Sequence, residues 1–306
     1  MENRIVVFVI SIMLAFGNLF GQQEPMFTQY MHNNMTMNPA YAGTRNALSI
    51  SALSRLQWVG LEGAPKTYNI ALHAPVSSKH IGIGATVIID EIGPLRNTYF
   101  TINYAYRLKL NELWTLSMGL KIGFNNFHLG LSRLDLVDVD DPDFYSDVKR
   151  VFVPNAGIGI YAYTEKFYIG LSAPKILQTK IETAGEDNSV LRRHYFMVTG
   201  YTFNLNATFK MKPSMAAKFV EGAPVSVDLT ALLGYNDLIW LGPDYRIGDA
   251  IGVILNIQIT KQLMIGYSFD YSVTRLSGYN KGSHEILISY DMDGFLNRKV
   301  KSPRYF

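Results

Sequence analysis

Clustered carboxylates between residues 128 and 150 are the first residues whose types and spacing suggest chemistry. The cluster comprises Asp135, Asp138, Asp140, Asp141, Asp143 and Asp147. Carboxylates at alternate positions suit a hard cation such as calcium, and the weak candidate ligands are Asp138, Asp140, Asp141 and Asp143. The EF-hand pattern fails, because Pro142 stands at its fifth position and Asp143 where glycine is needed. A solvated acidic loop is the favoured interpretation, and calcium binding is the alternative.

The histidines lack the spacing of a metal site. They are His32, His73, His80, His128, His194 and His284. None stands in an H-x-x-H or H-E-x-x-H pair, so polar residues at strand ends are the favoured interpretation. The sequence has no G-x-S-x-G elbow of a serine hydrolase, and no cysteine to serve as nucleophile or thiolate ligand. We therefore expect no enzymatic activity, no metal and no cofactor.

Residues 1–21 have the features of a secretory signal peptide. Arg4 supplies a positive charge, and residues 5–16 form an apolar stretch of the expected length. Gly17 and Gly21 are small residues suited to cleavage, and we place the cut after Gly21. The alternative is a membrane anchor or a core helix, but the polar sequence that follows begins too abruptly for a spanning helix. We expect an exported protein.

The composition narrows the class of protein. Hydrophobic residues make up 48% of the chain and charged residues 17%, which excludes intrinsic disorder. The net charge of +3, with acids and bases interspersed, gives no reason to expect a nucleic-acid partner. Beyond residue 22 there is no run of about 18 uncharged apolar residues, the minimum for a spanning helix. An exported chain of this kind is either a secreted β-sandwich or an outer-membrane β-barrel.

Alternation of apolar and polar residues indicates long β-strands. In the segment 113–127 one face carries Trp114, Leu116, Met118, Leu120, Ile122 and Phe124, and the other carries Thr115, Ser117, Gly119, Lys121, Gly123 and Asn125. A helix would spread both sets around its axis. Strands of about ten residues, tilted by about 45°, match the apolar band of an outer membrane in height.

The polar faces carry charges that a dry sandwich core would not accommodate. They include Arg107, Lys109, Lys121, Asp228 and Asp270. Because burying such charges without water or partners is expensive, we predict an all-β fold, a transmembrane antiparallel β-barrel in which Leu120 and Ile265 face lipid. Glycines on the lumen side would make room for an inserted chain segment; these are Gly119, Gly123, Gly157 and Gly159.

The barrel is predicted to cover residues 46–291 with about 14 strands, within a range of about 12–16. The predicted strands are 46–57, 66–74, 81–90, 96–109, 113–127, 151–163, 166–173, 192–203, 207–218, 225–235, 238–245, 249–260, 262–273 and 284–291. With both termini in the periplasm, the long connections 128–150 and 174–191 fall on the external side. Tyrosines near strand ends predict an interfacial girdle; they are Tyr41, Tyr68, Tyr99, Tyr161, Tyr163, Tyr168, Tyr235, Tyr245 and Tyr279.

Two segments flank the predicted barrel. Residues 22–45 lack alternation and are rich in Met, Asn and aromatic residues, which favours a plug-like element in the lumen or across its periplasmic mouth. An ordinary linker is the alternative. Residues 292–306 form a basic tail that is expected in the periplasm. Its candidate contacts with a periplasmic partner are Arg298, Lys299, Lys301 and Arg304.

An ordered series of short motifs resembles the PorP/SprF family over essentially the whole mature chain. The motifs are Phe27-Thr-Gln-Tyr30, Asn38-Pro-Ala-Tyr-Ala-Gly43, Arg55-Leu-Gln-Trp58, Gly63-Ala-Pro65, His73-Ala-Pro75, Asp90-Glu-Ile-Gly93 and Ser302-Pro-Arg-Tyr-Phe306. The motif residues before the tail are Phe27, Gln29, Tyr30, Asn38, Pro39, Tyr41, Gly43, Arg55, Gln57, Trp58, Gly63, Pro65, His73, Pro75, Asp90 and Gly93. One small departure is Thr28, where the family usually has serine.

That family comprises outer-membrane components of the type IX secretion system of Bacteroidota. The resemblance implies a non-catalytic barrel that binds a secreted cargo protein through its C-terminal targeting domain. It also implies that the barrel aids export or surface anchoring of the cargo, such as gliding adhesins, together with other secretion-system components. The residues themselves reach only an outer-membrane barrel in contact with lipid. A channel or transporter for small solutes or hydrophobic molecules is therefore the alternative, and a soluble surface β-sandwich is a third reading.

Overall fold

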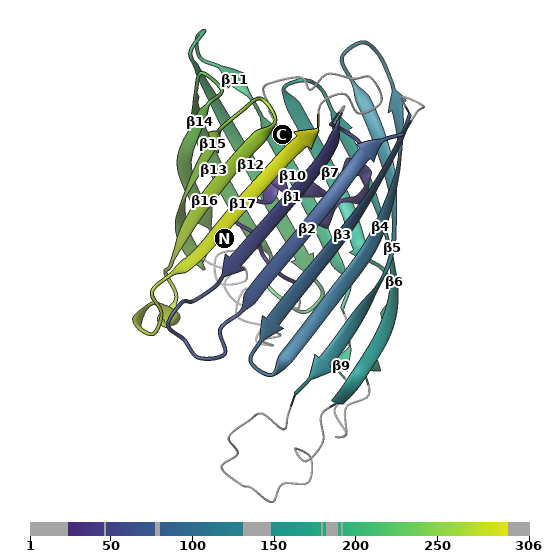
Figure 1. Cartoon of the computed structure of the whole chain (residues 1–306), viewed down its shortest axis with the longest axis vertical. Coiled ribbons are helices and arrows are strands. Elements are labelled where there is room, and N and C mark those ends of the chain that lie inside the picture. Colours follow the sequence, from purple (N-terminus) through teal and green to yellow (C-terminus); the bar gives the residue numbers. More distant parts are fainter. Residues whose placement is uncertain are drawn as a thin grey trace, which may run out of the picture.

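Antiparallel strands close into one barrel (Figure 1). The computed structural model describes residues 24–45, 47–76, 80–130, 148–178, 180–181, 189–190 and 192–292. The fourteen barrel strands are β1 (Leu48–Leu56), β2 (Lys66–Pro75), β3 (Ile81–Ile92), β4 (Leu95–Lys109), β5 (Thr115–Leu129), β6 (Val148–Tyr163), β7 (Phe167–Lys175), β10 (His194–Tyr201), β12 (Phe209–Val220), β13 (Ser226–Tyr235), β14 (Ile239–Arg246), β15 (Ala250–Gln258), β16 (Leu263–Ser272) and β17 (Ser283–Met292). Strand β1 pairs with β17, and the β10–β12 pair closes the cylinder.

Each predicted strand coincides with one barrel strand, so the predicted fold class and strand number are confirmed. Three short strands lie outside the closed ladder: β11 (Phe203–Asn204) pairs only with β12, and β8 (Lys180–Ile181) pairs with β9 (Ser189–Val190). The described helices are η1 (Tyr30–His32), α2 (Asn34–Met37), η2 (Pro39–Tyr41) and η5 (Arg275–Gly278). Within the described residues, no helix is long and apolar enough to span a membrane.

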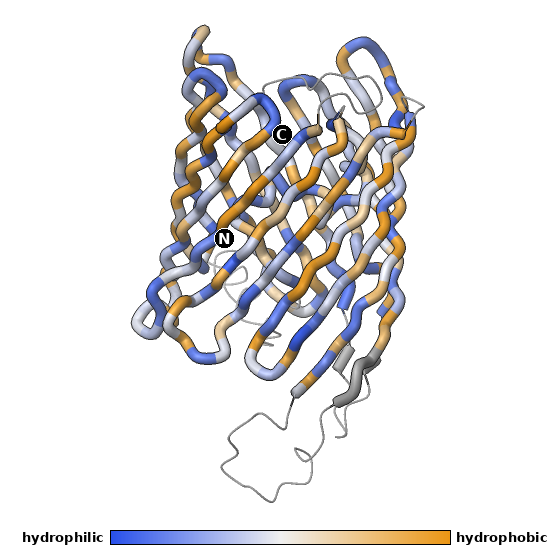
Figure 2. The backbone as a smooth tube through the Cα atoms, viewed as in Figure 1, coloured by the Kyte–Doolittle hydropathy of each residue, from blue (hydrophilic) through white to orange (hydrophobic). Residues whose placement is uncertain are grey.

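The two faces of the barrel wall differ in chemistry, as the alternation predicts. Leu120 is 57% exposed and Ile265 41% exposed on the outer surface, whereas Lys121 and Asp270 are buried inside. Figure 2 shows the hydrophobic and hydrophilic residues alternating along the strands. Exposed Ile, Leu and Tyr side chains on the outer surface are stable when the barrel lies in the hydrocarbon of a membrane. Lys109 departs from the prediction, because it lies exposed at the end of β4 and not in the lumen.

Substitution on the outer face gives a direct test of its contact with lipid. Replacing Leu120 by Arg should lower the free energy of unfolding in bilayers by about 2–4 kcal/mol, because it buries a cation in hydrocarbon. Leu110 is also exposed but follows the end of β4, so Leu110→Arg should cost about 0–1 kcal/mol near the interface. Denaturant titration of the barrel in lipid vesicles measures both values. Equal costs at the two positions would contradict a lipid-facing band.

The segment 24–45 lies inside the barrel and supplies much of its core. Figure 1 shows its short helices within the cylinder of strands. Its buried residues include Tyr30, Met31, Met35, Ala40, Tyr41 and Ala42, which pack against Tyr161, Tyr168, Leu232, Trp240 and Ile254 of the wall. A wall of fourteen strands encloses more space than its own side chains fill. The inserted segment occupies that space, so the predicted plug in the lumen is found among the described residues.

The segment runs along the lumen and is not confined to one mouth. Thr28 contacts Glu285 near the start of β17, whereas Arg45 forms an ion pair of 3.5 Å with Asp291 at the far end of the same strand. Of the two placements that the sequence allows, the lumen is therefore observed, and not the periplasmic mouth alone. The predicted signal peptide and the basic tail lie outside the described residues, and the predicted segment boundaries remain predictions.

The predicted tyrosine girdle is partly wrong. Tyr68, Tyr235, Tyr245 and Tyr279 are exposed. Tyr41, Tyr99, Tyr161 and Tyr168 are instead buried inside the barrel. The rings of Tyr161 and Tyr168 stack with centroids 5.7 Å apart, and Tyr41 contacts Tyr161 edge-on at 5.6 Å. Tyr41 belongs to the inserted segment itself, and Tyr161 and Tyr168 pack against that segment in the lumen. Tyr99 points to the inside of the wall, where the Lys175 ammonium lies over its ring.

Candidate functional site: the filled lumen

Arg55 of β1 holds the inserted segment to two other strands. Its guanidinium contacts the Asp270 carboxylate of β16 at 2.7 Å and the Glu285 carboxylate of β17 at 3.2 Å. It also donates to Thr28 Oγ1 at 2.8 Å. All four side chains are buried. The cluster therefore joins three strands and the inserted segment around one cation.

Backbone groups of the segment complete this cluster. The N–H groups of Thr28 and Gln29 donate to the two carboxylate oxygens of Glu285 at 3.0 and 2.8 Å. Thr28 Oγ1 in turn donates to Asp270 at 2.6 Å. Hydrogen bonds to charged groups are about twice as strong as neutral ones. One arginine faces two carboxylates, so the segment's N–H groups stabilise charge that the wall alone leaves partly unpaired.

A second buried network lies on β13 and β14. Arg246 of β14 donates to Asp228 of β13 at 2.6 Å. Thr230 Oγ1 donates to Asp244 at 2.9 Å and accepts from the Tyr30 hydroxyl of the segment at 3.1 Å. The Tyr30 hydroxyl therefore joins the segment to this network through Thr230.

Asn38 and Pro39 dock against glycines of the wall. Asn38 Nδ2 donates to the carbonyl oxygens of Ile160 at 2.9 Å and Leu171 at 3.3 Å. A Cβ atom at Gly159 would collide with the Asn38 side chain, and one at Gly119 would collide with the Ala40 backbone. The prediction that lumen glycines make room for an inserted chain is confirmed for Gly119 and Gly159. It is wrong for Gly123 and Gly157, where the nearest atoms belong to neighbouring strands.

This fit makes the docking sensitive to one methyl group. Gly159→Ala should lower the free energy of unfolding by about 1–3 kcal/mol, because overpacking displaces Asn38 from its two carbonyl partners. Gly278 serves as the control, since a Cβ atom there meets nothing within 4 Å, and Gly278→Ala should stay within about 0.5 kcal/mol of the parent. Urea denaturation in detergent compares the two. A Gly159→Ala protein as stable as Gly278→Ala would contradict the docking.

Gly43 marks the point where the segment joins the wall. Its φ is +73°, and a Cβ atom there would lie 2.6 Å from the Gly82 Cα, so only glycine fits. His73 Nδ1 accepts from the Gly43 N–H at 3.1 Å, and the His73 ring meets Tyr41 edge-on at 5.3 Å. The Gly43 carbonyl accepts from Arg107. These contacts direct the chain from the lumen into β1.

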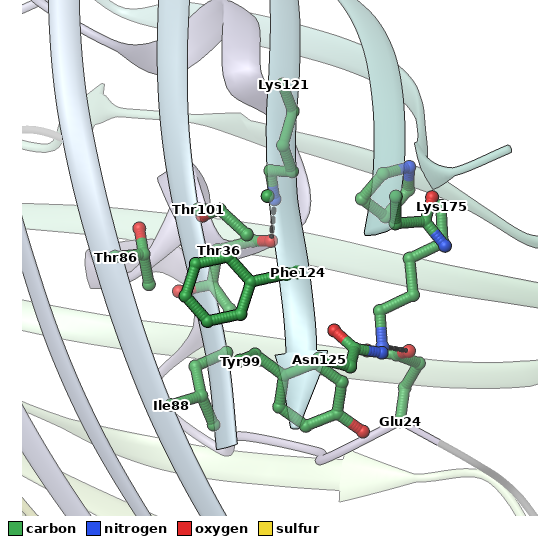
Figure 3. A pocket seen from close by; sticks show the side chains of 13 residues that line it. Glu24, Thr36, Thr86, Ile88, Tyr99, Thr101, Lys121, Phe124, Asn125 and Lys175 are labelled. Atoms are coloured by element: carbon green, nitrogen blue, oxygen red, sulfur yellow. Dashed lines mark hydrogen bonds and ion pairs between the residues drawn. The ribbon is translucent and has the colours of Figure 1, made fainter. Parts of the chain in front are cut away.

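Glu24 lies at the other end of the segment, among basic side chains. Its carboxylate forms an ion pair with Lys175 (Figure 3), and its carbonyl accepts from Lys218 at 3.2 Å. Burial acts to raise the pKa of Glu24, but the charges of Lys175, His194 and Lys218 outweigh it and the pKa is lowered. The carboxylate is therefore ionised at neutral pH and holds this end against β7 and β12.

The remaining motif residues build the rim at the end of the barrel where β1 and β2 are linked. The Val59 N–H donates to Gly282 at 2.8 Å and the Lys281 N–H to Val59 at 2.7 Å, which joins the links 57–65 and 273–282. The Gly93 N–H donates to Gly63 at 2.9 Å. Trp58 has a φ of +50°, an uncommon conformation for a bulky residue. The rim is therefore a set of loops that backbone hydrogen bonds join to one another.

The structure thus divides the predicted family-motif residues into two groups. Those in or against the lumen are Phe27, Gln29, Tyr30, Asn38, Pro39, Tyr41, Gly43, Arg55, His73, Pro75 and Asp90, and those of the rim are Gln57, Trp58, Gly63, Pro65 and Gly93. The candidate calcium ligands Asp138, Asp140, Asp141 and Asp143 lie outside the described residues. The same holds for Arg298, Lys299, Lys301 and Arg304 of the tail.

Several residues that hold the segment were not predicted from the sequence. They are Glu24, Lys175 and Glu285, and Asp244 and Arg246 of the second network were not predicted either. One signal was present for Glu285, since it stands between outward-facing positions of a strand and so points into the lumen. No sequence pattern pairs it with Arg55 or Thr28, because that contact depends on how the barrel closes.

Comparison with known proteins identifies both the family and the fold. The family model described as "Type IX secretion system membrane protein PorP/SprF" matches residues 19–290. No curated protein sequence matches the chain.

Among solved structures, the toluene transporter TbuX of Ralstonia pickettii is similar with a TM-score of 0.51 and 10% identity, over 87% of this chain and 93% of that one. The CymD monoaromatic hydrocarbon channel has a TM-score of 0.47 and 11% identity, over 89% and 95% of the two chains. The KdgM porin has a TM-score of 0.40 and 9% identity, over 80% and 99%. At these identities the likeness concerns the barrel fold alone.

Proposed function

The chain belongs to the PorP/SprF family of type IX secretion system membrane proteins, and on that premise we propose that it binds a secreted cargo protein through the cargo's C-terminal targeting domain. It is an outer-membrane barrel, and it aids export of the cargo or its anchoring at the cell surface. Gliding adhesins are the expected kind of cargo. Other secretion-system components are its partners on the periplasmic side.

The filled lumen is the observation that carries this proposal. Segment 24–45 is held at Glu24, at the Arg55 cluster, at Asn38 and at Gly43. Four attachment points along the barrel axis favour a fixed occupant over a gate that opens with each solute. A barrel filled in this way acts through its surface, as a protein that retains cargo would.

The rim supports a cargo-facing surface at the end opposite the point where the segment enters β1. Its hydrogen-bonded links present Tyr279, 75% exposed, and Leu61. Aromatic side chains of this kind are common anchors in protein interfaces. The sequence assigns the longest links, 128–150 and 174–191, to the same end. We propose that cargo binds over this end and that the basic tail contacts the secretion apparatus at the other.

A channel or transporter is the second candidate, and the fold of TbuX, named as a toluene transporter, is compatible with it. Among the described residues, the cavity beside the segment measures about 40 Å³, whereas an engineered cavity that binds benzene measures about 150 Å³. This cavity is therefore too small to favour a path for such a solute. An open conductance from the purified parent protein would favour this candidate.

Surface labelling of the cargo in living cells tests the proposal. Replacing residues 134–147 by a Gly-Ser linker of equal length should reduce cargo retention while barrel assembly stays normal. Removing residues 298–306 should impair secretion itself, because it removes four cations that would contact the periplasmic machinery. Lys261→Ser, in an exposed turn, is the control. Parental display in both variants, with cargo absent from pull-downs of the parent barrel, would overturn the proposal.

A further inference from the structure

A cavity lies between the inserted segment and the barrel wall (Figure 3). Its volume is about 40 Å³, which is room for very few water molecules, since one water occupies about 30 Å³ in the liquid. Glu24 and Thr36 line it from the segment. The polar wall residues are Thr86, Thr101, Lys121, Asn125, Asn155 and Lys175.

The strand register lines up several residues of this lining. Thr86 pairs with Thr101, Thr101 with Gly123, and Gly123 with Asn155, so one row crosses β3, β4, β5 and β6. Side chains opposite each other in such a row lie about 5 Å apart. Lys121 and Asn125 stand two residues to either side of Gly123 on the same face, and at Gly123 itself a Cβ atom would collide with the Phe100 carbonyl oxygen of the next strand. The cavity is therefore lined by an ammonium group, amides and hydroxyls.

The two lysines of the cavity differ in their partners. Glu24 pairs with Lys175, whose ammonium also lies 3.7 Å from the centre of the Tyr99 ring. Lys121 is buried and donates to the Thr36 carbonyl at 2.7 Å. Within the part of the chain that the structure describes, no ion pair with a carboxylate is found for Lys121. An ammonium carries three donors, so it retains capacity for an anion.

Further hydrogen-bond donors in the same lining lack partners. Asn125 Nδ2, Thr101 Oγ1 and Thr86 Oγ1 are buried without a hydrogen bond. The side chains of Thr86 and Asn125 belong to residues only 2% exposed. An unsatisfied buried donor costs about 1–3 kcal/mol, so several donors in one lining favour a hydrogen-bond acceptor in this cavity.

We propose that this cavity, a small hollow beside Gly123, binds a small monovalent inorganic anion of the size of chloride. The Lys121 ammonium holds it, together with the Asn125 amide and the threonine hydroxyls of the lining. A single water accepts two hydrogen bonds at most, whereas a halide accepts more and also compensates the charge of the Lys121 ammonium. The bound anion would couple β3, β4 and β5 to the inserted segment at Thr36. This inference does not depend on the proposed function.

Bromide is the probe that distinguishes an anion from water. Crystals of the mature protein grown in sodium bromide should show an anomalous peak in the hollow. Unfolding of the protein in detergent should also shift to higher denaturant in bromide or chloride than in gluconate of equal ionic strength, because a ligand of the folded state stabilises it. Lys121→Met should weaken halide binding at least about tenfold.

Lys212→Met is the matched control, since Lys212 is another buried lumen lysine, 5.9 Å from the Trp240 ring and outside the cavity. It should keep the parental halide dependence. Asn125→Leu serves as a second variant if Lys121→Met fails to fold, and it should also weaken halide binding. The proposal would be overturned if crystals grown in bromide show density for water in the hollow and no anomalous peak. It would also be overturned if unfolding of the parent and of the cavity variants depends equally on halide.

Discussion

Replacing Arg55 by Met is expected to lower the free energy of unfolding by about 3–5 kcal/mol, because it leaves two buried carboxylates without their cation. Asp270 and Glu285 lie within 2.7 and 3.2 Å of the guanidinium, and all three side chains are buried. The segment should also loosen, since Thr28 loses a donor from Arg55. Denaturant titration in detergent gives the stability, and limited proteolysis near residue 28 reports the loosening.

Arg96 provides the control for this experiment. It forms an ion pair of 3.5 Å with Glu91, with side chains 56% and 36% exposed. Exposed pairs contribute about 0–1 kcal/mol, so Arg96→Met should change stability little. Adding Asp270→Asn and Glu285→Gln to Arg55→Met should recover part of the loss, because the carboxylate charges are removed. If Arg55→Met and Arg96→Met are equally stable, the cluster does not hold the segment.

The barrel was predictable from the sequence because the alternation within each strand shows which side chains face outward and which face inward. In β5, Leu120 and Lys121 alternate in the way that an outer apolar face and an inner polar face require. The same rule could have placed Tyr161 correctly, since it has the parity of Gly157 and Gly159, which were assigned to the lumen. Nearness to the end of a strand does not by itself place a tyrosine at the membrane interface, because the alternation decides which face it occupies.

The path of the inserted segment was not predictable in the same way. Its lack of alternation indicates a non-strand element, but its reach from Glu24 to Gly43 depends on contacts with residues more than two hundred positions away. Those contacts exist only once β1 pairs with β17 and sets Arg55 opposite Glu285. The candidate calcium ligands lie outside the described residues, so calcium binding remains a prediction from the sequence.

Removing residues 25–43 is expected to convert a closed barrel into an open channel. The segment supplies the centre of the lumen core, including Tyr30, Met31 and Met35. Fourteen strands enclose more space than the wall fills, and barrels with a few more strands hold aqueous channels. The exposed wall would then be lined by Lys121, Lys212 and other charged residues that attract water. Planar-bilayer recordings should show stable steps of ionic current for the variant that lacks residues 25–43 and none for the parent.

A synthetic peptide of residues 24–45 should close this channel again when it is added in trans, because its binding contacts all lie on the intact wall. Asn38 contributes two hydrogen bonds to that wall, at 2.9 and 3.3 Å. A peptide with Asn38→Leu loses both, so the concentration that blocks half of the current should rise about tenfold, which corresponds to a loss of about 1–2 kcal/mol. A peptide of scrambled sequence controls for unspecific block. Folding of the deleted barrel is verified by its β-sheet circular dichroism and its resistance to protease. Open steps already present in the parent, or equal block by the scrambled peptide, would show that the segment is not the element that fills the lumen.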